Sequence, residues 1–124
     1  MTTNSLSWFE IPVADFDRAR AFYGTIFDYD MPVETMGPAT KMGIFLHERG
    51  TGVGGAIVTG DRKPSEHGSV VYLTAGRDLQ VVLSRVEQAG GTVILPKTPI
   101  APGMGFFALL NDSEGNRVGL HSME

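Results

Sequence analysis

The sequence predicts an α+β fold made of two tandem βαβββ modules. The order strand, helix and three strands occurs twice along the 124 residues. Each expected helix follows an aspartate, Asp15 or Asp78, in the position of an N-terminal cap. Sixteen glycines, several of them in pairs or turns, indicate the short connections of a strand-rich fold. We expect one domain over residues 1–124, with module one at about 5–59, a linker at 60–67 and module two at about 68–122.

Module one starts with the alternating segment SLSWFEIPV, which predicts a strand over residues 5–13. Trp8 and Glu10 share one face of this strand, and Ile11 lies on the other. A helix follows over "DFDRARAFYGTIF", with an apolar stripe at helical spacing. Three further strands are expected around residues 31–36, 41–48 and 53–59.

Module two repeats the pattern after a polar segment. SVVYLTA at 69–75 predicts a strand, and "DLQVVLSRVEQAGG" predicts a helix ended by two glycines. Strands are then expected at 92–96, 104–111 and 116–122. In the last strand Val118 and Leu120 share one face, while Arg117, Gly119 and His121 share the other. Curving of the two sheets around a cleft, with the helices outside, is the expected architecture.

Three stretches resemble the vicinal oxygen chelate superfamily, which includes glyoxalase I, extradiol dioxygenases and bleomycin and fosfomycin resistance proteins. They are "FEIPVADFDRARAFYGTIF", "VEQAGGTVILPKTPI" and "NDSEGNRVGLHS". The resemblance covers essentially the whole chain and implies the paired-module fold. It is poorly specific for function, because the superfamily contains isomerases, oxygenases, transferases and proteins that only bind.

The resemblance also implies where a divalent metal would bind in the enzymes of this family. Its ligand positions correspond to Trp8, Ala56, Ser69 and Gly119, the middle two within about a residue. Indole, methyl and hydrogen side chains cannot ligate a metal, and a neutral hydroxyl is a poor ligand. We therefore expect no metal and no other cofactor. A glycine at 119 is expected to open space in the cleft, with Trp8 opposite as a stacking surface.

The remaining polar residues of this face offer two interpretations each. Glu10 and His121 form either an acid–base pair or a structural contact, and a metal site with only these two ligands is a weaker alternative. Arg117 either clamps an anionic group or lies at the rim, in solvent or paired with Glu114. Phe45 and Phe106 are expected to line an apolar pocket, with core packing as the alternative. The histidines in "HERG" and "EHG", His47 and His67, are expected to be solvent-exposed.

The amino-acid composition argues against several classes of binding partner. Net charge is −4 and the basic residues are scattered, which argues against nucleic-acid and membrane binding. The chain has no cysteine, which removes disulfides and thiolate chemistry and fits a cytoplasmic protein. No segment has the length of a membrane span.

Three functions remain open. The first is a metal-independent protein that binds a small organic molecule in the cleft, of the resistance or sequestration kind. The second is a glyoxalase-like lyase or isomerase that uses Glu10 and His121, although a metal-dependent glyoxalase I is not expected. The third is an interaction module with a filled cleft. A homodimer is expected in each case.

Overall fold

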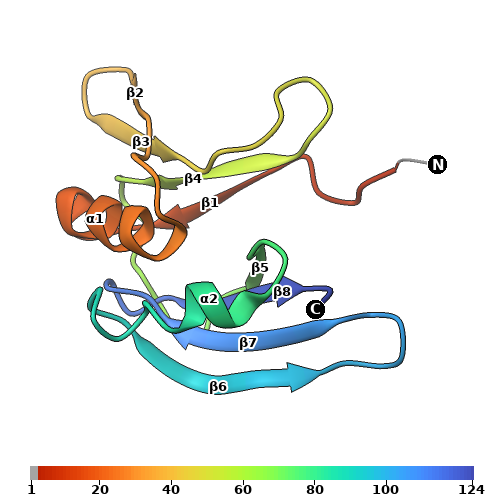
Figure 1. Cartoon of the computed structure of the whole chain (residues 1–124). Coiled ribbons are helices and arrows are strands. Elements are labelled where there is room, and N and C mark those ends of the chain that lie inside the picture. Colours follow the sequence, from red (N-terminus) through yellow and green to blue (C-terminus); the bar gives the residue numbers. More distant parts are fainter. Residues whose placement is uncertain (1–2) are drawn as a thin grey trace.

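Two βαβββ modules make up residues 3–124, the part of the chain that the computed structural model describes (Figure 1). The predicted α+β class and repeated element order are confirmed. Module one contains β1 (Trp8–Pro12), α1 (Phe16–Phe27), β2 (Val33–Met36), β3 (Thr40–Ile44) and β4 (Gly54–Val58). Module two contains β5 (Val71–Thr74), α2 (Leu79–Leu83), β6 (Thr92–Pro99), β7 (Phe106–Asn111) and β8 (Arg117–Ser122).

Each module folds its four strands into one mixed sheet with the same topology. The first sheet has the order β1-β4-β3-β2, and the second sheet has the order β5-β8-β7-β6. The first strand of each module runs parallel to the last, and the other pairs are antiparallel. The repeat seen in the sequence is therefore a repeat of topology.

The two helices start as predicted but differ in length. The Asp15 carboxylate accepts the backbone N–H of Arg18, and that of Asp78 accepts the N–H of Gln80. The second helix ends at Leu83, and backbone bonds such as that from the Val86 N–H to the Leu83 carbonyl continue it as tighter turns. The expectation that the helix continues until Gly90–Gly91 is thus wrong, although its apolar stripe faces the core. No helix within residues 3–124 is long and apolar enough to cross a membrane.

The larger of two hydrophobic clusters joins the two modules, and a smaller one of Met42, Ile44 and Ala56 lies on the other face of the first sheet. Both helices pack on the sides of the sheets that face each other, and α1 contacts α2 (Figure 1). Buried side chains from both sheets and both helices meet there, among them Ile11, Tyr23, Ile57, Leu83 and Leu120. Each sheet consequently has an inner face toward this core and an outer face that points away from it.

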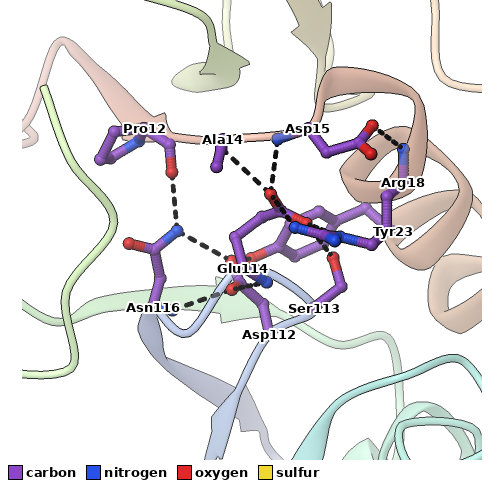
Figure 2. Close-up of polar contacts among 9 residues, drawn as sticks. All are labelled: Pro12, Ala14, Asp15, Arg18, Tyr23, Asp112, Ser113, Glu114 and Asn116. Atoms are coloured by element: carbon purple, nitrogen blue, oxygen red, sulfur yellow. Dashed lines mark hydrogen bonds and ion pairs between the residues drawn. The ribbon is translucent and has the colours of Figure 1, made fainter. Parts of the chain in front are cut away.

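The turn at Asp112–Asn116 ties the end of the chain to its beginning, and we call these contacts the module junction (Figure 2). The Glu114 side chain is fully buried and accepts the backbone N–H groups of Ala14 and Asp15 at 3.0 and 2.7 Å. The Arg18 guanidinium donates two further bonds to the same carboxylate, at 2.7 and 3.0 Å. The turn therefore closes over the start of α1.

Two buried contacts complete the module junction. The Tyr23 hydroxyl donates to the Asp112 carboxylate at 2.7 Å, and the Asn116 side-chain amide donates to the Pro12 carbonyl at 2.7 Å. Burial and the neighbouring Asp112 charge raise the pKa of Tyr23, so this hydroxyl keeps its proton. The polar residues of "DSEGN" thus connect the two modules.

Candidate ligand-binding faces

Most of the candidate site residues lie on the outer faces of the two sheets. Trp8 and Glu10 lie on the outer face of the first sheet, because their neighbour Ile11 is buried in the core. Gly119 and His121 lie on the outer face of the second sheet, on the side opposite Leu120. The two outer faces are not fully separated, because Glu10 and Arg117 line one cavity and His47 and Tyr72 line another. Glu10 and His121 line different cavities, so they are not brought together within one chain.

The first outer face carries a polar and aromatic cluster around Trp8. The Trp8 side chain is 38% exposed, and its Nε1 donates to the Glu10 carboxylate at 3.3 Å. The His47 ring meets the Trp8 ring edge-on, with centroids 6.2 Å apart. A cavity of about 240 Å³ opens beside them, lined by Trp8, Glu34, Ile44, His47, Arg49 and Gly50. Glu34 and Arg49 pair at 3.5 Å, which leaves the cavity wall without net charge.

The second outer face is mainly apolar. The ring centroids of Tyr72 and Phe107 lie 6.2 Å apart. These two residues, together with Ile100 and His121, line a cavity of about 340 Å³. The His121 Nε2 atom lies 2.8 Å from the Met104 carbonyl oxygen. This combination of aromatic walls and one polar group is typical of small-molecule sites.

Gly119 does not open space as expected from the sequence. It pairs with Tyr72 on the adjacent strand, and the Tyr72 ring lies directly over it. A Cβ atom at Gly119 would collide with that ring. Trp8 is on the other outer face, so it is not opposite Gly119 within the chain. The glycine accommodates an aromatic side chain from its neighbour.

The positions that correspond to metal ligands in family enzymes do not fit a divalent metal. Trp8 and Ala56 lie on the first sheet, and Gly119 lies on the second beside Tyr72. Ser69 precedes β5, which starts at Val71. Indole, methyl, hydroxyl and hydrogen side chains replace the carboxylates and imidazoles that such metals prefer. No three His, Cys, Asp or Glu side chains of residues 3–124 cluster as a metal site.

Arg117 is held by two neighbours on the second outer face. Its Nε donates to the Asn111 side-chain oxygen at 2.7 Å, and its Nη2 lies 3.7 Å from the Glu66 carboxylate. The expected alternative pairing with Glu114 is wrong, because that carboxylate binds Arg18 in the module junction. The Arg117 side chain is a quarter exposed, so its guanidinium remains within reach of an anionic group.

Phe45 and Phe106 lie on the core side of their strands. Phe45 is 6% exposed and packs edge-on against Tyr23 and Phe27. It also borders a cavity of about 600 Å³ between the modules. Phe106 packs against the core under the Lys97 ammonium, and its neighbour Phe107 pairs with His121 instead.

Sequence reasoning missed His47. His67 has an 86% exposed side chain, as expected, but His47 is half-buried against Trp8. Its ring occupies the space above Gly54, which pairs with Trp8 on the adjacent strand. The signal in the sequence was the pair Gly54–Gly55, since a glycine facing an aromatic residue leaves room for a further ring.

Comparison with known proteins agrees with this architecture. The sequence profile of the glyoxalase/bleomycin resistance protein/dioxygenase superfamily matches residues 5–120. The chain belongs to this superfamily. A glyoxylase-like domain-containing protein from Didymella fabae is 26% identical over 113 residues, covering 90% of this chain and 88% of its own.

Two solved structures show the same fold in this superfamily. A glyoxylase/bleomycin resistance protein/dioxygenase domain from Frankia sp. EAN1pec has a TM-score of 0.70 at 15% identity, covering 99% of this chain and 100% of its own. The fosfomycin resistance protein FosX from Listeria monocytogenes has a TM-score of 0.67 at 19% identity, covering 98% and 94%. At these identities the likeness establishes the fold.

Proposed function

We propose that this superfamily member binds a small organic molecule between two copies of the chain, without a bound metal. The observation that carries the proposal is that Trp8 and His121 line different cavities, of about 240 and 340 Å³. A ligand bound in one chain would contact only one of these two side chains. A homodimer that places the first outer face of one copy against the second outer face of the other encloses two equivalent sites.

The residues of the proposed site come from both copies. Trp8 and Glu10 line one side, and His121 and Arg117 of the second copy line the other. Tyr72, held over Gly119, supplies an aromatic wall. Phe106 is left out because it packs against the core, and Phe45 is left out because it borders the cavity between the modules of its own chain. The acidic net charge of the chain fits neither nucleic acid nor an anionic membrane as partner.

Metal independence is supported by the side chains at the ligand positions. A binding function of the resistance kind is supported by the fold shared with a fosfomycin resistance protein. A lyase or isomerase that uses Glu10 and His121 is the second candidate, since a dimer places a carboxylate and an imidazole on facing walls. It predicts that Glu10→Gln and His121→Ala each abolish turnover and leave the fold intact.

The test combines a measurement of molecular mass in solution with a screen for ligand binding. Light scattering should give twice the mass of one chain, and a thermal-shift screen of small aromatic and carbonyl compounds should find ligands that raise Tm equally with and without EDTA. Bound metal measured by elemental mass spectrometry should stay far below one per chain after incubation with nickel, zinc, manganese and iron(II). A monomer without ligands overturns the proposal, and one tightly bound metal per chain overturns its metal independence.

A further inference from the structure

Each outer face presents one histidine whose ring orientation is fixed by a backbone carbonyl. The His47 Nδ1 atom lies 2.8 Å from the Phe45 carbonyl oxygen, and the His121 Nε2 atom lies 2.8 Å from the Met104 carbonyl oxygen. A carbonyl oxygen only accepts hydrogen bonds, so the imidazole nitrogen facing it must carry the proton. In the neutral rings, His47 Nε2 and His121 Nδ1 are therefore left with a lone pair.

His47 is the better-defined of these two acceptors. No protein group within residues 3–124 is hydrogen-bonded to its Nε2 atom. Its ring is packed between Gly54 and the edge of Trp8, and it borders the 240 Å³ cavity of the first outer face. Packing of this kind limits the positions that the ring can adopt, so the lone pair is presented in a fixed direction.

From this geometry we infer that the site takes a neutral, planar ring bearing an acidic O–H, such as a phenol or an enol, with His47 Nε2 as the acceptor of its proton. The inference rests on the proposed function, because it names the ligand class of that same site. The exposed Trp8 indole supplies the surface on which a flat ring packs. The Arg49–Glu34 pair gives the cavity wall no net charge, which favours an uncharged ligand.

In the proposed dimer, His121 of the second copy faces the same ligand. The His121 residue borders an apolar cavity with Tyr72 and Phe107, where water competes less for hydrogen bonds. A planar ligand thus meets aromatic side chains and one imidazole acceptor on each side. Only His47 is needed for the inference, and His121 keeps the role given to it above.

The experiment uses two probes that differ in one hydrogen-bond donor. 4-Chlorophenol carries the O–H and stays un-ionised at neutral pH, and 4-chloroanisole has the same ring with a methyl ether. Trp8 is the only tryptophan of the chain, so quenching of its fluorescence reports binding at the first outer face. The wild-type protein should bind 4-chlorophenol about tenfold more tightly than 4-chloroanisole, the effect of one hydrogen bond.

Two variants separate a local role of His47 from a general loss of structure. His47→Phe keeps a ring over Gly54 and removes the acceptor, so the two probes should bind it equally. His67→Asn changes an exposed histidine and should keep the wild-type preference. Nitrogen NMR should show the proton of neutral His47 on Nδ1 in the wild-type protein, a readout that does not depend on ligand binding.

The possible outcomes test the role of His47, the ligand class and the proposed function separately. A preference that survives in His47→Phe, or a proton on Nε2 of His47, overturns the role of this residue. Failure of both probes, with other ligands found in the thermal-shift screen, overturns the ligand class and leaves the proposed function standing. Failure of the screen as well overturns the proposed function itself.

Discussion

At the scale of single residues, glycines determine where aromatic and imidazole rings can lie. Gly54 accommodates His47, and Gly119 accommodates Tyr72, so one glycine on each outer face has a ring packed over it. The two positions are not equivalent in the repeat, since Gly119 corresponds to Ala56 on the last strand of module one. Because these glycines have no side chain, the ring of another residue packs directly on the backbone at each point.

Gly119→Ala should destabilise the protein by about 1–2 kcal/mol, because the added methyl displaces the Tyr72 ring from its contact with Phe107. In a Tyr72→Ala background the same substitution should cost little, so the two changes should be coupled. Urea unfolding of the four proteins measures this coupling. Gly68→Ala, which adds a methyl group where no atom lies within 4 Å, is the matched control. Additive effects of the two substitutions would contradict the packing described here.

At the scale of elements, the module junction connects the β7–β8 turn to the start of α1. Glu114 satisfies backbone N–H groups at the entry of the helix and an arginine of its first turn. Burial by itself would raise the pKa of Glu114, but the bonds from Arg18, the Asp15 backbone and Ser113 outweigh it and lower the pKa to about 2. The charged form of this carboxylate is therefore part of the folded structure.

Acid should weaken the module junction over a defined range. Because the pKa of Glu114 is lower in the folded protein than its ordinary value of 4.5, its contribution is complete above pH 4.5 and is lost as the pH falls toward 2. The whole contribution is on the order of 3 kcal/mol. Urea midpoints measured between pH 7 and pH 2.5 should show this loss.

Glu114→Gln should be less stable than the wild-type protein at pH 7 by about 2–3 kcal/mol and should lose less stability on acidification. Glu87→Gln, at an exposed glutamate, should follow the wild-type pH dependence. An unchanged pH dependence in Glu114→Gln would show that other carboxylates are responsible for the acid sensitivity.

At the scale of the whole molecule, the shared core leaves two large sheet faces uncovered. Exposed apolar side chains lie on the second outer face and at its margin, including Tyr72 and Ile100, at 52% and 39% exposure. Apolar surface of this kind on a sheet is typical of an association site. A second copy that offers its first outer face covers it and completes the proposed ligand site.

Ile100→Glu should weaken the dimer by on the order of 100-fold, because a charge would be buried at the interface without a partner. Val81→Glu places the same charge on an exposed position of α2, away from both outer faces, and should leave the dimer intact. Light scattering over a dilution series measures both, and circular dichroism confirms that the fold is kept. Equal dissociation of the two variants would remove the support for this interface.

The sequence predicted the elements and faces well because both follow from local periodicity. Alternation alone assigned Trp8 and Glu10 to one face of β1, which was expected to line the cleft, and Ile11 to the opposite face. The relative placement of the modules was not predictable, since it depends on the core that the two helices share. Glu114 was considered as a partner of Arg117 for the same reason, because nothing local indicates that Arg18, 96 residues away, takes its carboxylate.

The module junction also has a consequence for the order in which the chain folds. The groups that close the start of α1 lie about a hundred residues further along, so this closure waits until the turn at 112–116 has been synthesised. Contacts of such long range slow folding, because the entropy of closing the loop is lost before the contacts form. On the ribosome, module one therefore emerges with the entry of its helix open, and the last strands of the protein bring both modules to their final state together.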